Sequence, residues 1–116
     1  MADFGIPQVD LDNADLHDGK VPGYLRKDMA GITRGNDIYF RPGVYDAKTV
    51  GGMAILGHEL VHVGQYRNGM TWLSYGMESM RNGYENNKYE IPAYKMTNRI
   101  IDELSKKGGG SPCGCK

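Results

Sequence analysis

A nine-residue string, GHELVHVGQ at residues 57–65, constrains the fold of this 116-residue chain more than any other feature. Apolar residues recur at spacings of three and four through residues 50–68, which predicts one amphipathic helix around the string. His58 and His62 then lie one turn apart on the same face of that helix, so both imidazoles can reach a single ion. The rest of the chain must fold so that this face can complete a metal site.

Glu59 adds a carboxylate beside the two histidines. It sits about 100° around the helix from His58, close enough to meet a metal-bound water without being a ligand itself. Zinc lowers the pKa of its bound water toward about 7, and a nearby carboxylate can take the proton as the water attacks a carbonyl. The motif therefore predicts zinc (Zn2+) on His58 and His62, with Glu59 as the base in peptide-bond hydrolysis.

A third zinc ligand must come from outside the motif, because a catalytic zinc takes three protein ligands and keeps an open position. Gln65 and Asn68 exclude the metzincin continuation, which needs glycine and histidine at these positions. The one remaining histidine, His17, lies in the N-terminal segment. The downstream carboxylates that remain are Glu78, Glu85 and Glu90.

Glu90 is the favoured third ligand because the string NKYEIPAY predicts the start of a helix. A glutamate in that first turn can point across to the motif helix, and Ala93 leaves room for it. Glu85 lies in the GYENN connection and is the second choice. Two tyrosines near Glu90 in sequence, Tyr84 and Tyr94, are candidates to donate a hydrogen bond to the oxyanion, with plain packing as the alternative for both.

Two further features of the motif helix carry expectations. Gln65, one turn beyond His62, can orient a ligand through its amide, or can serve only as a cap or a solvent-facing residue. Gly57 and Gly64 each cost about 1 kcal/mol of helix propensity relative to alanine. We expect another element to pack closely against both glycines.

The remaining pattern predicts an α+β fold that is mostly helical, with a small antiparallel sheet or hairpin. Residues 29–41 predict a hairpin that turns at Gly35-Asn36. Residues 71–82 predict a short helix with a narrow buried face that includes Trp72, and residues 90–106 predict the last helix. Its inward-facing residues are expected to be Ala93, Thr97, Ile100, Ile101 and Leu104.

A single domain is expected over residues 1–107, with residues 1–22 as an irregular N-terminal arm. The aspartates of this arm miss the spacing of an EF-hand, which favours a solvated loop over a calcium site. Residues 108–116 predict a flexible glycine-rich tail. Its Cys113 and Cys115 are too close in sequence for an unstrained disulfide.

Charge and hydropathy limit the partners. Fourteen basic residues balance fourteen acidic ones, so no net field favours nucleic acid or an anionic membrane. No apolar stretch approaches the roughly twenty residues of a membrane span. The acidic N-terminus lacks the basic region and apolar core of a signal peptide. We expect a monomer with a protein or peptide substrate.

Longer strings carry a family resemblance. HELVHVGQ followed by NKYEIPAY resembles the gluzincin metallopeptidases. Residues 35–65, with GNDIYF, PGVY and HELVHVGQ, are similar to the extracellular contractile injection system core domain, and the resemblance extends over about residues 28–95. It implies a minimal zincin fold with zinc on His58, His62 and Glu90. Tyr66 and Pro92 depart from the residues usual in the family, which leaves substrate preference open.

The resemblance also implies a bacterial setting in which such domains accompany toxins and injected effectors. The leading expectation is therefore an endopeptidase, secreted or injected as an effector or toxin-associated module. The alternative is a non-catalytic interaction module of an injection or secretion system, stabilised by zinc. Its partners would be the injection apparatus or a cognate inhibitor.

Overall fold

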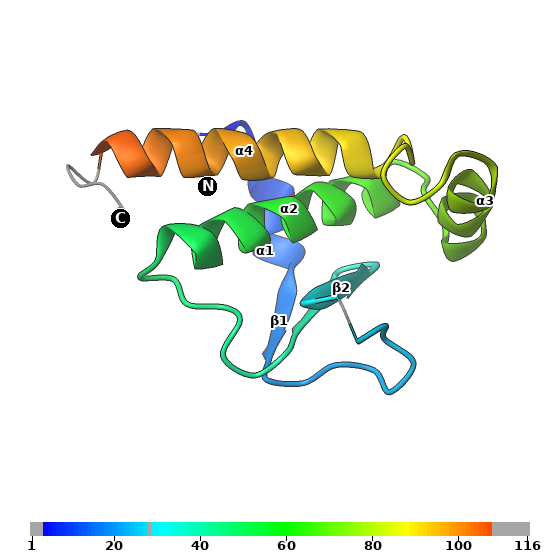
Figure 1. Ribbon diagram of the computed structural model, residues 1–116, viewed down its shortest axis with the longest axis horizontal. Helices are drawn as coiled ribbons and strands as arrows, with labels where there is room; N and C mark the ends of the chain where they lie inside the picture. Colours follow the sequence, from blue (N-terminus) through cyan, green and yellow to red (C-terminus); the bar gives the residue numbers. More distant parts are fainter. Residues whose placement is uncertain (1–3, 28, 108–116) are drawn as a thin grey trace.

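Helix α2 (Val50–Arg67) forms the centre of the computed structural model, which describes residues 4–27 and 29–107. Helix α4 (Glu90–Lys107) runs antiparallel beside it, and the strands lie below α2 (Figure 1). Helix α3 (Trp72–Asn82) lies at the far end of this pair, and the short helix α1 (Gln8–Asn13) lies behind it. The α+β class is confirmed.

Both ends of α2 follow from local sequence. The Thr49 hydroxyl accepts a hydrogen bond from the Gly52 amide at 2.9 Å and so caps the first turn. The helix ends at Arg67 with Asn68 as its C-cap, and Gly69 follows with a φ of 112° that favours glycine. The predicted helix over residues 50–68 is therefore confirmed.

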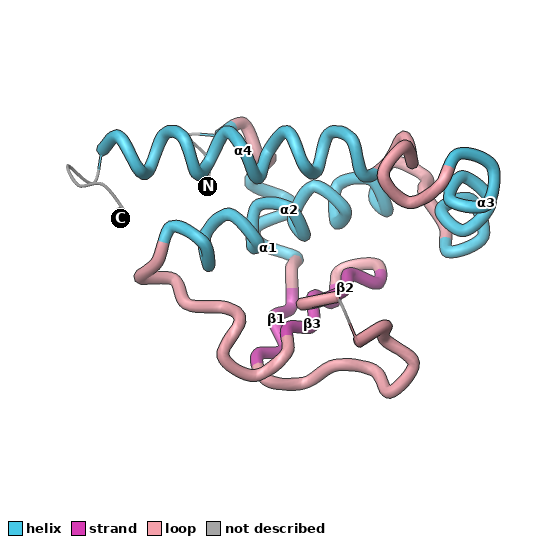
Figure 2. The backbone as a smooth tube through the Cα atoms, viewed as in Figure 1, coloured by secondary structure: helices cyan, strands magenta, loops and turns pink. Residues whose placement is uncertain are grey.

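Three short strands form a mixed sheet in the order β1-β3-β2. Strands β2 (Gly31–Arg34) and β3 (Asp37–Phe40) pair antiparallel around Gly35, whose φ is 63°, and confirm the predicted hairpin. Strand β1 (Asp15–Asp18) adds to β3 in parallel. Figure 2 shows the three strands side by side, with long loops around them.

The prediction of an irregular arm over residues 1–22 is wrong, because α1 and β1 both form there. Each is too short to show a hydrophobic period, and β1 exists only through its backbone pairing with β3. Asp10 also contradicts the expected solvated loop. It is 1% exposed and accepts from Arg67 Nε at 2.7 Å, which ties α1 to the end of α2.

The core has two parts. The first lies between the sheet and α2 and consists of Ile6, Ile38, Phe40, Leu56, Leu60 and Val63. The second joins α2 to α4 through Ala54 and Ile100, with Phe4 beside them. Helix α2 is thus buried on two sides.

Both glycines of the motif helix have the close neighbours that were expected. A Cβ atom at Gly57 would lie 2.2 Å from Ile100 Cδ1, and one at Gly64 would lie 2.9 Å from Asp10 Oδ2. The missing side chain at Gly57 is what lets α4 approach α2 so closely. Helix propensity is given up here for tertiary packing.

The prediction of a buried face on α3 is wrong. Within the described residues α3 buries no side chain fully, and Leu73 and Met80 are 72% and 88% exposed. The helix lies at the end of the α2–α4 pair and not over a core. In α4, Ala93 and Ile100 are buried as expected, but Ile101 is 43% exposed and half-buried Met96 packs inward in its place.

None of the helices in the described ranges is both long and apolar enough to cross a bilayer.

The contact at Gly57 predicts opposite effects of one substitution at two positions of α2. Gly57→Ala must displace the fully buried Ile100 and should lower the free energy of unfolding by about 1–3 kcal/mol. Gly51→Ala has no atom within 4 Å of the new Cβ and should raise it by up to about 1 kcal/mol. Urea denaturation with a chelator present measures both. Equal effects at the two positions would contradict this packing.

Candidate metal centre

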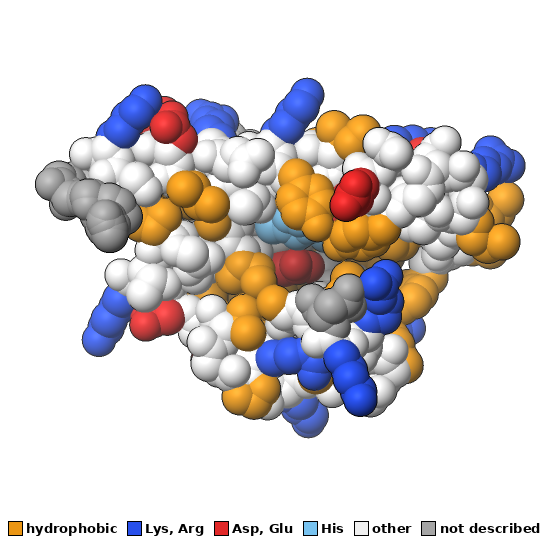
Figure 3. Space-filling model, viewed as in Figure 1, with side chains coloured by type: hydrophobic (Ala, Val, Ile, Leu, Met, Phe, Trp, Pro, Cys, Tyr) orange, Lys and Arg blue, Asp and Glu red, His pale blue; other side chains and the backbone are white. Residues whose placement is uncertain are grey.

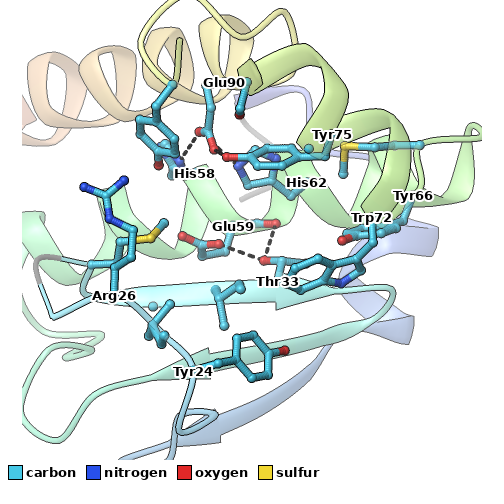
Figure 4. Close-up of a pocket in the computed structure, with 18 residues that line it drawn as sticks. Tyr24, Arg26, Thr33, His58, Glu59, His62, Tyr66, Trp72, Tyr75 and Glu90 are labelled. Atoms are coloured by element: carbon cyan, nitrogen blue, oxygen red, sulfur yellow. Dashed lines mark hydrogen bonds and ion pairs between the residues drawn. The ribbon is translucent and has the colours of Figure 1, made fainter. Parts of the chain in front are cut away.

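Three side chains from two helices converge between α2 and α4. Nε2 of His58 lies 3.0 Å from Oε1 of Glu90, and Nε2 of His62 lies 3.2 Å from the same oxygen. All three residues are buried. Figure 4 shows both rings and the Glu90 carboxylate pointing toward one another. Of the three carboxylates proposed from the sequence, Glu90 is the one that the fold brings to the histidines.

The other ring nitrogen of each histidine is fixed by a second partner. Thr97 Oγ1 donates to the Ala93 carbonyl, so its lone pair accepts from His58 Nδ1 at 3.1 Å. Gln65 Nε2 donates to the Tyr89 carbonyl at 2.8 Å, so its Oε1 accepts from His62 Nδ1, also at 2.8 Å. Both Nδ1 atoms therefore carry the proton, which leaves the Nε2 lone pairs free. Gln65 thus orients His62, which was one of its two predicted roles.

The donor set fits a divalent ion. Two Nε2 lone pairs and a carboxylate oxygen are all acceptors, so either a metal ion or a proton must lie between them. A tetrahedral zinc with bonds of about 2.0–2.1 Å places neighbouring ligand atoms about 3.3 Å apart. The separations of 3.0 and 3.2 Å are close to this value. The cluster of His58, His62 and Glu90, here called the His–Glu cluster, can hold a metal.

Electrostatics within the His–Glu cluster favour charge separation. Burial alone would raise the pKa of Glu90, but hydrogen bonds with His58 and His62 and the charge of His62 outweigh it and lower this pKa far below its ordinary value. Burial would likewise lower the pKa of His62, yet the Glu90 carboxylate raises it overall. Glu90 is thus an anion that attracts any cation into the site.

Tyr75 of α3 supplies a further contact that sequence reasoning missed. Its hydroxyl donates to Oε2 of Glu90, so the two carboxylate oxygens have separate partners. Burial and the Glu90 carboxylate both raise the pKa of Tyr75, which keeps the phenol protonated. Tyr75 therefore holds the Glu90 carboxylate in the orientation that turns Oε1 toward the histidines.

Glu59 is buried beside the His–Glu cluster but is not part of it. Its Oε1 accepts from the hydroxyl of Thr33 on β2 at 2.8 Å. This bond fixes the carboxylate against the sheet, and Figure 4 shows Glu59 on the side of the cavity opposite Glu90. The Glu59 carboxylate is therefore not one of the candidate metal ligands.

Two cavities meet at His58 and Glu59. One, of about 500 Å³, extends toward α3 and is here called the α3 cavity. The other, of about 590 Å³, extends along the first half of α2 toward α4 and is called the α4 cavity. Figure 3 shows the hollow between the helices and the sheet, with histidine and acidic side chains at its floor and apolar side chains at its rim. A ligand can thus reach the cluster from solvent.

The remaining predicted residues lie elsewhere. Glu85 is exposed and lines the α4 cavity, while Glu78 accepts from Asn82 and from the Lys88 amide. His17 lies on β1, 3.1 Å from Asp37. With Asp15 and Asp37 it forms a second group of possible ligands, in which Asp15 is exposed and the other two residues are half-buried. Cys113 and Cys115 lie outside the described residues.

The two predicted tyrosines have different surroundings. Tyr84 is half-buried and lines both cavities. Burial and the charge of Glu90 raise its pKa, so it stays a donor. Tyr94 is 42% exposed and packs edge-on against the His58 ring at 4.8 Å between centroids. For both tyrosines, the hydrogen bond to the oxyanion that the sequence suggested stays a prediction.

Sequence reasoning missed Thr33, Tyr75 and the contact of Thr97 with His58. Thr97 carried a usable signal, because it lies seven residues after Glu90 and so on the same face of α4. Thr33 and Tyr75 carried none. Their contacts depend on how the sheet and α3 are placed against α2, which local patterns do not encode.

Comparison with known protein families gives one match. The model of the eCIS core domain matches residues 5–70, which include α1, the sheet and all of α2. The match begins earlier than the resemblance expected over residues 28–95, and it ends before Glu90. Comparisons with curated proteins and with solved structures gave no significant match.

The hydrogen bond from His58 Nδ1 predicts a specific effect at Thr97. Thr97→Val keeps the shape of the side chain but removes the acceptor, and should weaken zinc binding by about 10–100-fold. Thr97→Ser keeps the hydroxyl and should bind zinc almost as tightly as the wild type. Competition with a chromophoric chelator measures the affinities. Wild-type affinity in the valine variant would contradict the tautomer assignment.

Proposed function

This chain belongs to the eCIS core domain family, and from that premise and the geometry of the His–Glu cluster we propose that it is a zinc-dependent endopeptidase of the gluzincin type. One observation carries the proposal. A buried group of two histidines and a glutamate opens onto a cavity, and a separate buried carboxylate, Glu59, borders the same cavity. This is the arrangement that metal-assisted hydrolysis requires.

Zinc is the metal that the donors favour. Two imidazole nitrogens and one carboxylate oxygen form a set typical of catalytic zinc, whereas structural zinc sites are closed by four protein ligands. Within the described residues the cluster contributes three donors. Bound there, zinc would supply a Lewis acid for the substrate carbonyl and a more acidic water at neutral pH.

Glu59 would act as the general base. Its carboxylate accepts one hydrogen bond, from Thr33, and the fixed position keeps it directed at the cavity. After accepting a proton from the attacking water it can pass that proton to the leaving amine. Tyr84, which lines both cavities, is the tyrosine that we propose to donate to the oxyanion. Tyr94 would support the His58 ring by its edge contact.

A peptide is the substrate that the surroundings favour. Strand β2 lies at one edge of the sheet, and its residues Gly31 and Thr33 line the α3 cavity. An extended peptide can pair with a free strand edge through main-chain hydrogen bonds. The balanced charge of the chain supplies no general attraction for nucleic acid.

Membership of the family relates the chain to extracellular contractile injection systems of bacteria. We propose that the peptidase acts as an effector or toxin-associated module that such a system delivers. Its partners would then be a protein substrate, the apparatus itself or a cognate inhibitor.

A second role deserves a test because the three ligands join α2 to α4, the two longest helices. A metal bound there would stabilise the fold whether or not hydrolysis occurs. The chain would then be a zinc-stabilised interaction module of the injection system. Glu59 separates the two roles, since a purely structural site needs no base.

We predict that Glu59→Gln keeps stoichiometric zinc and lowers the hydrolysis rate by about 10²–10⁴-fold, because the metal ligands remain while the base is lost. Glu85→Gln changes an exposed carboxylate that lines the α4 cavity and should leave the hydrolysis rate unchanged. The measurement is the appearance of new amino termini in a mixed peptide pool, read by mass spectrometry, beside metal analysis of each protein.

A zinc-loaded wild type that generates no new termini would favour the interaction module. Hydrolysis at the wild-type rate by Glu59→Gln would contradict the assignment of the base.

A further inference from the structure

The far part of the α3 cavity is walled by aromatic and apolar side chains. This part is lined by Tyr24, Ile32 of β2, Tyr66, Met70 and Trp72. None of these five carries a charge at neutral pH. Arg26, Glu59 and the ionisable groups of the His–Glu cluster border the same cavity where it meets the metal centre. The cavity is therefore polar at the reacting end and apolar beyond it.

The aromatic wall is held in place despite its exposure. Tyr24 is 56% and Trp72 45% exposed, and their rings meet edge-to-face at 5.8 Å. Arg34 lies over the Trp72 ring at 4.8 Å and donates to the Tyr24 hydroxyl at 2.8 Å. Cation–π contact and this hydrogen bond join three segments: the loop before β2, the end of β2 and the start of α3. A preformed wall costs little entropy when a ligand packs on it.

The start of α3 explains why Trp72 faces the cavity. Thr71 and Ser74 form a capping box that fixes the first turn. Trp72, Gly76 and Ser79 then follow at spacings of four and three and line the cavity together. The adjacent Leu73 points away and is 72% exposed. Two neighbouring apolar residues thus have different surroundings, which supplies a matched pair for a test.

The α4 cavity on the other side of Glu59 has a more mixed lining. Thr97, Glu85 and Tyr94 place hydroxyl and carboxylate groups along it. The two sides of the reacting position therefore offer different environments. A substrate that spans both would be selected mainly on the α3 side, where the uninterrupted apolar surface can be covered.

From these observations we propose that the α3 cavity is a specificity pocket for a large apolar side chain, aromatic by preference, next to the bond that is cut, with Trp72 as its determinant. This inference rests on the proposed peptidase function. Covering the exposed rings removes apolar surface from water, so a phenylalanine in the substrate gains about tenfold or more over alanine. An aspartate or lysine would lose its hydration against these five uncharged side chains.

The chain itself provides the probe for this pocket, because Trp72 is its single tryptophan. The experiment uses the zinc-loaded Glu59→Gln protein and a set of blocked hexapeptides that differ at one central position, with phenylalanine, leucine, alanine, aspartate or lysine there. We expect the phenylalanine peptide to shift the tryptophan emission to the blue in a saturable manner. Its dissociation constant should be at least about tenfold lower than that of the alanine peptide.

A second measurement assigns the effect to Trp72. Fluorescence anisotropy of labelled peptides compares Trp72→Ala and Leu73→Ala, both made in the Glu59→Gln protein. Trp72→Ala should reduce the preference for phenylalanine over alanine to less than about threefold, whereas Leu73→Ala should keep it. Zinc content checks that each variant retains its fold.

Equal affinity for the phenylalanine and alanine peptides, tighter binding of the charged ones, or no binding at all would overturn the proposal. These readouts measure binding and not turnover. A wild type that binds the phenylalanine peptide selectively but cleaves nothing would therefore reject the peptidase function while keeping the pocket.

Discussion

The close packing of α4 against α2 is the contact on which the candidate metal centre depends. Two histidines on α2 supply only half of a site, and their partner Glu90 begins a helix almost thirty residues later. The absence of a side chain at Gly57 lets Ile100 lie against the backbone of α2. That approach places the first turn of α4 within about one ligand spacing of the imidazoles. The packing of Ile100 against Gly57 in the core thus determines whether Glu90 reaches the two histidines.

The polar contacts around the site then define what each group can do. Thr97 and Gln65 hold the protons of the two imidazoles away from the centre, so that both lone pairs face Glu90. Thr33 of the sheet fixes Glu59 on the opposite side. In the proposed site, helices therefore supply the ligands, while the sheet positions the base. Because the sheet has to position Glu59 and the helices provide the other groups, a sheet of three short strands is sufficient for the site.

Much of this arrangement could be predicted from the sequence, because its signals are local. The motif, its capped helix and the start of α4 near Glu90 depend on residues within one or two helical turns. The parallel pairing of β1 and the Asp10–Arg67 contact could not be predicted, since each joins segments with no shared pattern. Tyr75 was missed for the same reason. The apolar stripe of α3 led to the wrong prediction of a buried face, because this stripe is exposed.

Anomalous diffraction at the zinc edge, on crystals of the zinc-loaded protein, shows directly whether the His–Glu cluster holds the ion. We expect one strong peak about 2.0–2.1 Å from Nε2 of His58, Nε2 of His62 and Oε1 of Glu90. A peak held instead by the second group, Asp15, His17 and Asp37, would contradict this assignment. So would a fourth protein ligand that closes the site.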